Sequence, residues 1–152
     1  MSPWIEKYRP TCFADVKGQD EAVSSLKSFI NNFYISETGR KFSISKSKKK
    51  ALILHGPTGT GKTTIAHVSA LETDSEIFEL NASDLRDRDK MQTVLKPAIE
   101  QKPLIKDRKI ILVDEVDGIS AVDYGGLSEL LRLIETKTYP IIITANDIWN
   151  KK

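Results

Sequence analysis

Cysteine, long apolar runs and net charge are all scarce in this sequence. Cys12 is the single cysteine, so no disulfide can form within the chain. No run of apolar residues approaches the roughly 18 that a membrane-spanning helix needs, and residues 1–10 lack the apolar core of a signal peptide. The formal net charge is only +2, so the overall balance requires neither a nucleic acid nor a membrane as partner. We therefore expect an intracellular protein that does not cross a membrane and has no membrane partner.

The length of the chain favours one domain. A sequence of 152 residues with 39% hydrophobic content can form one core, whereas a second full domain would be cramped. Positive charge gathers in residues 38–50, where lysines and one arginine stand among serines without an acidic residue. This composition predicts a mobile basic loop. Contact with DNA phosphates and a merely solvated loop both remain open, and solvated loops of this kind are common.

Short aliphatic segments predict a parallel sheet. Residues 52–54, 110–113 and 141–143 are unbroken aliphatic runs, which is typical of strands that helices cover on both faces. Residues 77–80 predict a fourth strand nearer an edge, because this segment contains Glu79. The fold class is therefore α/β.

Helical patterns separate these strands. Apolar residues recur at helical spacing from Asp20 onward and again in residues 62–71 and 88–101, where Pro97 should bend or divide the helix. A last helix is predicted from the spacing of Leu127, Leu130, Leu131 and Ile134. Alternating strands and helices imply right-handed crossovers and a three-layer α/β/α sandwich.

A glycine-rich segment, residues 56–63 (GPTGTGKT), matches the phosphate-binding loop pattern between a predicted strand and a predicted helix. Such a loop points successive backbone N–H groups at a phosphate, and the following helix adds the positive end of its dipole. Lys62 would place its charge on the phosphates, and Thr63 would offer a hydroxyl to Mg²⁺. The alternative is a glycine-rich turn before an ordinary helix. The predicted nucleotide contacts here are Gly56, Pro57, Thr58, Gly59, Thr60, Gly61, Lys62, Thr63 and Thr64.

Two carboxylates follow the aliphatic run 110–113. Because ligands of open α/β sheets bind at the carboxyl ends of strands, Asp114 is expected beside the phosphate loop, where it can hold Mg²⁺ through water. Glu115 is a candidate to orient and deprotonate an attacking water. Alternatively, both acids cap the next helix. For Asp117 we favour a helix cap or a salt bridge.

The run 141–143 also ends in polar residues. A neutral side chain there could hydrogen-bond a phosphate or the attacking water, and Asn146 is preferred to Thr144 for this role. The alternative is a turn-forming asparagine. The catalytic candidates are thus Lys62, Glu115 and Asn146.

Together these three motifs resemble Walker A, Walker B and sensor 1 of the AAA+ ATPases. The strings WIEKYRP (residues 4–10) and ELNASD (79–84) are similar to the clamp-loader branch, replication factor C. HGP (55–57), DEVDGIS (114–120) and GGLS (125–128) resemble its large subunits of archaeal type. The resemblance runs from residue 4 to residue 149, except for residues 38–50.

This resemblance implies a portion of an ATPase, with ATP and Mg²⁺ as cofactors, that loads a sliding clamp onto primed DNA. It implies as partners the clamp-loader small subunits, the sliding clamp and primer-template DNA, and a cytoplasmic, nucleoid-associated location in a prokaryote. Asn81 matches a polar position that holds the catalytic glutamate aside until DNA engages, although an asparagine capping a strand end is the alternative. Within residues 1–18, the resemblance assigns the adenine pocket to Tyr8, Arg9, Pro10, Val16 and Gly18.

The family's fifth core strand, helical lid and collar have no counterpart in residues 1–152. The family's strand order would place residues 52–54 at an open edge, so we expect a separate chain that carries the lid and collar, or an incomplete fragment. Two functions stay open: a catalytic piece of a clamp loader, and a non-hydrolysing module whose nucleotide only stabilises an assembly. A related AAA+ motor for Holliday junctions is disfavoured by residues 8–10 and 81–84.

Expressed by itself, the chain should self-associate or be poorly soluble, because an open apolar strand edge recruits other strands. It should also bind ATP weakly. Size-exclusion chromatography and an ATP titration measure both properties. A monodisperse monomer with tight ATP binding would contradict the expectation.

Overall fold

Four parallel strands form the centre of the computed structural model, which describes residues 8–35, 51–57, 59–82, 88–118, 124–135 and 139–146. The sheet has the order β1-β4-β3-β2. The strands are β1 (Ala51–His55), β2 (Ser75–Asn81), β3 (Arg108–Asp114) and β4 (Ile141–Ala145). All three pairings are parallel, which confirms the predicted α/β sheet with the 77–80 strand at an edge.

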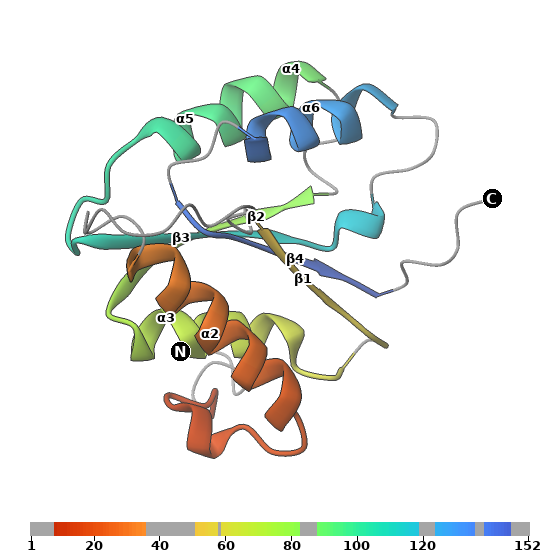
Figure 1. Cartoon of the computed structure of the whole chain (residues 1–152). Coiled ribbons are helices and arrows are strands. Elements are labelled where there is room, and N and C mark those ends of the chain that lie inside the picture. Colours follow the sequence, from red (N-terminus) through yellow and green to blue (C-terminus); the bar gives the residue numbers. More distant parts are fainter. Residues whose placement is uncertain are drawn as a thin grey trace.

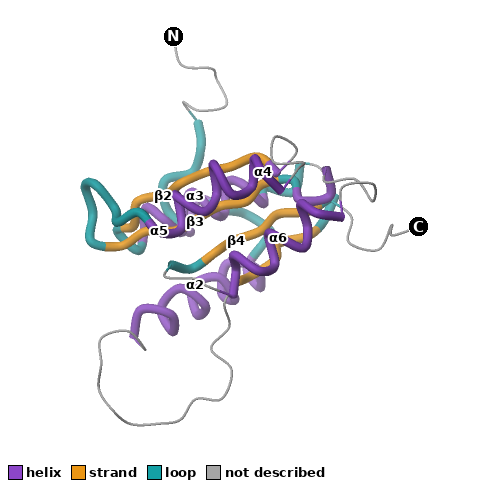
Figure 2. The backbone as a smooth tube through the Cα atoms, turned by 90° about the horizontal axis from the view of Figure 1, so that it is seen from above, coloured by secondary structure: helices purple, strands orange, loops and turns teal. Residues whose placement is uncertain are grey.

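Helices cover both faces of the sheet, which confirms the three layers (Figure 1). One face carries α2 (Asp20–Ile35) and α3 (Lys62–Glu72). The other carries α4 (Arg88–Lys90), the π-helical segment η3 (Met91–Leu95), α5 (Lys96–Glu100) and α6 (Tyr124–Glu135). Figure 2 views the sheet from the side of this second group. Short 3-10 turns stand at η1 (Phe13–Asp15) and η4 (Val116–Gly118).

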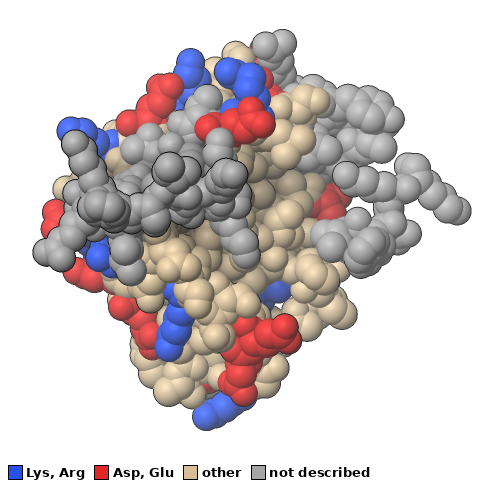
Figure 3. Space-filling model, viewed as in Figure 1, with Lys and Arg blue, Asp and Glu red and all other residues tan. Residues whose placement is uncertain are grey.

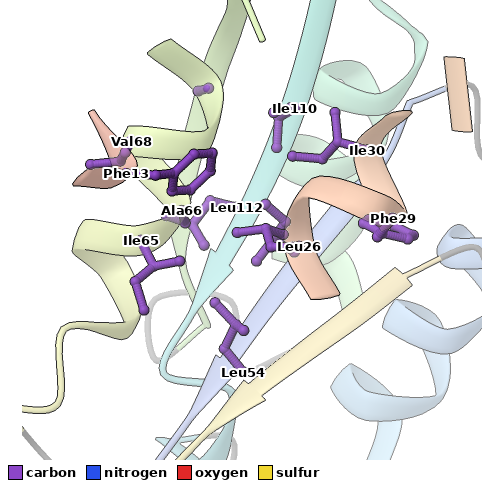
Figure 4. Packing of buried hydrophobic residues seen from close by; sticks show 12 residues of the cluster. Phe13, Leu26, Phe29, Ile30, Leu54, Ile65, Ala66, Val68, Ile110 and Leu112 are labelled. Atoms are coloured by element: carbon purple, nitrogen blue, oxygen red, sulfur yellow. The ribbon is translucent and has the colours of Figure 1, made fainter. Parts of the chain in front are cut away.

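The alternation of side chains along β3 explains why two apolar cores form. Ile110 and Leu112 face α2 and α3, where they join a cluster that includes Leu26 and Ile30 (Figure 4). Ile111 and the other alternate residues of β3 face the second helical layer. Successive strand residues point to opposite faces, so an unbroken aliphatic run buries both sides.

Pro97 divides the helix predicted over residues 88–101, as expected. The π-helical segment η3 precedes α5, and Pro97 lies in the first turn of α5. Proline is tolerated there because the first backbone N–H groups of a helix have no partner within it. The helix is therefore divided as predicted, and the five-residue π-helical segment separates its two α-helical parts.

The apolar face of α6 differs from the predicted one. Leu130 is buried as expected, but Leu131 is 57% exposed and Leu133 is buried in its place. Each residue turns about 100° around a helix, so Leu130, Leu133 and Ile134 share one face while Leu131 points away from it.

The edge position of β1 explains why its aliphatic run is incompletely buried. β1 pairs only with β4 within the described sheet, and Ile53 is 52% exposed while Leu54 is buried. Two predictions concern residues 52–54, burial on both faces and a place at an open edge. The structure bears out the edge position, and the burial on both faces is incomplete.

On the side of the molecule shown in Figure 3, Lys and Arg stand among Asp and Glu, so the described residues there form no surface of one charge sign. The basic segment 38–50 lies outside the described residues. In the part of the chain that is described, no helix has the length and apolarity to cross a membrane.

Candidate functional site

A cavity of about 210 Å³ opens at the carboxyl ends of β3 and β4, beside the start of α3. Ligands of parallel α/β sheets bind at the carboxyl ends of the strands. The cavity brings together residues from all three sequence motifs: Gly59, Gly61, Lys62, Thr63, Thr64, Asp114, Glu115, Thr144 and Asn146.

The loop between β1 and α3 is held at both of its ends. The Gly56 N–H donates to the carbonyl of Ala145 at the end of β4 (3.2 Å), and the Gly61 carbonyl accepts the Ile65 N–H of α3 (2.9 Å). Gly61 has φ +83°, a left-handed conformation that strains any residue with a side chain. The glycine therefore allows the chain to turn directly into α3. Thr58 lies outside the described residues.

Lys62 places its ammonium group inside this loop. Its Nζ donates to the carbonyls of Gly56 (2.7 Å) and Pro57 (2.9 Å) and lies 3.5 Å from the Thr60 hydroxyl. Thr60 in turn donates to the Pro57 carbonyl (2.9 Å). A full positive charge is thus concentrated where the loop bends around the N-terminus of α3, which favours an anion at this point.

Thr63 and Asp114 meet across the cavity. The Thr63 Oγ1 donates to the Asp114 Oδ1 at 3.0 Å, so a hydroxyl and a carboxylate oxygen from α3 and β3 lie side by side. Oxygen donors of this kind suit Mg²⁺, which binds proteins through one or two such groups and completes its shell with phosphate and water oxygens. The residues present therefore fit a magnesium ion shared with a phosphate.

Glu115 leaves β3 in a strained conformation. Its φ is +56°, a left-handed value that costs a residue with a side chain about 1–2 kcal/mol. The Asn81 side chain at the end of β2 donates to the Glu115 carboxylate (3.2 Å). Asn81 thus contacts the residue that the sequence singled out as the candidate base, so it does more than cap its own strand.

Two residues were given other roles from the sequence. Thr144, passed over in favour of Asn146, is buried, accepts the Glu115 N–H (3.0 Å) and donates to the Asp114 carboxylate. Asp117 accepts the Asn146 backbone N–H (3.2 Å), in place of the helix cap or salt bridge that we favoured. Both contacts join neighbouring strand ends, and only the pairing of β3 with β4 reveals them.

The proposed adenine-side residues lie apart from this cavity. Tyr8 is 66% exposed, and Arg9 and Pro10 are half-buried. Val16 packs against the α2–α3 core, and Gly18 has φ +75° in the turn before α2. None of the five lines the cavity, so their assignment stays a prediction.

A larger cavity of about 580 Å³ lies at the opposite end of the sheet, next to the start of β3. It is lined by residues of both charges, among them Lys27, Glu72, Asp74 and Arg108. No predicted site residue reaches it, and ligands of such sheets bind at the other edge. We therefore assign the site to the smaller cavity.

The histidines carry no sign of a site. His67 lies 2.7 Å from the Glu79 carboxylate, and His55 ends β1 on the surface. His55 is exposed because it stands at the end of an edge strand.

A three-layer fold with a glycine-rich loop between β1 and α3 is that of a P-loop α/β protein. The model of the "ATPase family associated with various cellular activities (AAA)" matches residues 52–151. The chain belongs to this AAA family of ATPases.

Relatives place the chain more narrowly. It is similar to the replication factor C large subunit of Thermofilum pendens, with 45% identity over 100% of this chain and 35% of that protein. The large subunit of Pyrobaculum aerophilum is 40% identical over 99% of this chain and 37% of its own length. The chain spans about a third of these relatives, in their N-terminal part.

A solved structure shares the fold. The structure titled "Structural Basis for Katanin Self-Assembly" has a TM-score of 0.67 and 26% sequence identity, over 91% of this chain and 46% of that one. The likeness of fold thus extends over nearly all of the chain.

Replacing Lys62 by alanine should reduce the affinity for nucleotide so far that binding is no longer detected. The substitution removes charge-assisted hydrogen bonds to the phosphates, which are worth roughly 1.5–3 kcal/mol each. Titration with a fluorescent ATP analogue measures the loss, and Lys90→Ala on the exposed helix α4 is the matched control. Unchanged affinity in Lys62→Ala would remove the phosphate-loop assignment.

Proposed function

We propose that the chain is the ATP-binding portion of a clamp-loader large subunit, which uses ATP binding and hydrolysis to load a sliding clamp onto primed DNA. The contact between Thr63 and Asp114 carries the proposal, because it sets oxygen ligands for Mg²⁺ beside the Lys62 loop. Similarity to replication factor C large subunits supports the clamp-loading role.

The site residues divide the work of phosphoryl transfer. Lys62 and the backbone N–H groups of the loop would bind the phosphates, and Thr63 with Asp114 would hold Mg²⁺. When bound, the ion neutralises charge on the phosphate oxygens. Glu115 would accept a proton from the attacking water, and Asn146 would orient that water without adding charge.

Asn81 supplies a way to regulate this chemistry. While its amide donates to the Glu115 carboxylate, that carboxylate is drawn toward β2. We infer that DNA binding releases this contact, which would free Glu115 to act as a base. The basic residues of segment 38–50 could contact the phosphates of that DNA. We propose that the complete assembly is associated with the nucleoid.

A non-hydrolysing assembly module is the second candidate. Lys62, Thr63 and Asp114 would bind nucleotide equally well in such a module. The strained turn at Glu115 favours hydrolysis, because strain of this kind is retained where function requires it.

The loop between α5 and β3 is a candidate contact for a protein partner. Leu104 and Ile105 are 80% and 88% exposed and stand next to each other in the chain. Their backbone N–H groups donate to the Glu76 carboxylate (2.9 and 3.1 Å). The Ile105 bond chiefly lowers the pKa of Glu76, so this carboxylate stays ionised at neutral pH.

The buried ammonium group of Lys109 also holds the start of this loop. Lys109 donates to the carbonyls of Ala98 and Gln101, and its Nζ lies over the rings of Phe78 and Tyr139. Burial lowers the pKa of Lys109, and the charge of Glu76 opposes that shift. Since the loop is held at Gln101 and again at Leu104 and Ile105, two aliphatic side chains are presented with little loss of freedom on binding. Because the chain is proposed above to be part of a clamp loader, we propose the sliding clamp as the partner for this contact.

Glu115→Gln should keep nucleotide binding and remove turnover, because the amide preserves the shape of the side chain but cannot accept the proton. Single-turnover hydrolysis in the complete assembly tests it, with Glu135→Gln on α6 as a matched control. Wild-type turnover in Glu115→Gln would support the assembly module instead.

The double variant Leu104→Ser, Ile105→Ser should weaken clamp binding by about tenfold or more, since burial of each aliphatic side chain is worth roughly 1.5–3 kcal/mol. Calorimetry with purified clamp measures it. Leu131→Ser on α6 is the control, because Leu131 is also exposed but does not belong to this loop. Equal clamp affinity in the double variant would refute the assignment.

A further inference from the structure

Side-chain hydrogen bonds continue the β3–β4 pairing beyond the point where the backbone ladder stops. The ladder runs from Ile111↔Ile141 to Val113↔Ile143. Beyond it, the hydroxyl of Thr144, one residue past Ile143, accepts the N–H of Glu115, two residues past Val113, at 3.0 Å. A side chain thus replaces the backbone partner at the residue where the chain leaves the sheet.

Thr144 can do this only because its hydroxyl both accepts and donates. It accepts from Glu115 and donates to the Asp114 Oδ1, and its side chain is buried. Valine has the same shape but neither function, whereas serine has both. The left-handed turn at Glu115 is therefore secured by a hydroxyl on the adjacent strand.

Asp117 makes the reciprocal contact. It lies in η4, directly beyond the turn, and its Oδ1 accepts the Asn146 N–H at 3.2 Å. Thr144 of β4 thus holds Glu115 on the β3 side, while Asp117 on the β3 side holds Asn146 at the end of β4. The candidate base and the candidate water-orienting residue are connected through two separate bonds.

We propose that Thr144 and Asp117 are positioning residues that fix Glu115 and Asn146 relative to each other. This inference rests on the proposed ATPase function, and neither residue is assigned a contact with nucleotide. A small displacement of a catalytic group lowers the rate far more than the affinity, so both residues should affect turnover selectively.

Amide hydrogen exchange in the complete protein without nucleotide tests the bonds directly. Thr144→Val should speed exchange of the Glu115 amide by about tenfold, the equivalent of one hydrogen bond, and Thr144→Ser should not. Asp117→Ala should do the same to the Asn146 amide, and Asp117→Asn, which keeps an acceptor oxygen, should not.

Single-turnover hydrolysis and ATP affinity then test the consequence. Thr144→Val and Asp117→Ala should each lower the rate by about tenfold or more with little change in ATP affinity, and the serine and asparagine variants should restore it. A purely structural role would instead lower the unfolding temperature and leave the rate of the folded fraction unchanged. Because Asp117 is exposed, Asp117→Ala tests the same linkage if Thr144→Val does not fold.

The outcomes separate this proposal from the function on which it rests. Wild-type exchange and wild-type rates in both Thr144→Val and Asp117→Ala would overturn the positioning role while leaving the ATPase intact. A wild-type protein that binds no ATP would overturn both, before any variant is compared.

Discussion

One carboxylate oxygen joins the three elements on which this site is built. The Asp114 Oδ1 accepts hydroxyls from Thr63 at the start of α3 and from Thr144 near the end of β4. Because Asp114 itself ends β3, a helix and two strands are held to a common point. The cavity, its charge and its candidate base all lie around that point. The bonds to both hydroxyls also offset the cost of removing these buried or partly buried polar groups from water.

The local structure around Asp114 follows from the sheet beneath it. Aliphatic residues bury both faces of β3, so its backbone cannot shift without disturbing two cores at once. In β3 and β4 the aliphatic runs give way to polar residues at the carboxyl ends, where Asp114 and Thr144 stand. A rigid apolar sheet thus presents a row of polar side chains at one edge, as phosphoryl transfer by preorganised groups requires.

Much of the fold could be predicted from the sequence because its signals are local. The four strands, the division of the helix at Pro97 and the glycine loop each depend on neighbours in the chain. The contacts of Thr144 and Asp117 could not be predicted, because they depend on the register between strands that are far apart in sequence. The exposure of Leu131 likewise depends on which side of α6 meets the sheet.

The bond from Gly56 to Ala145 gives the edge strand β1 an influence on the loop that follows it. β1 is paired on one side, so its local opening breaks fewer hydrogen bonds than opening of β3 would. Each such opening detaches the first residue of the loop from β4. Nucleotide binding, which needs the closed loop, is therefore coupled to the folding of β1. A ligand that binds only the closed loop would stabilise β1, and any change that stabilises β1 would in turn strengthen the binding of that ligand.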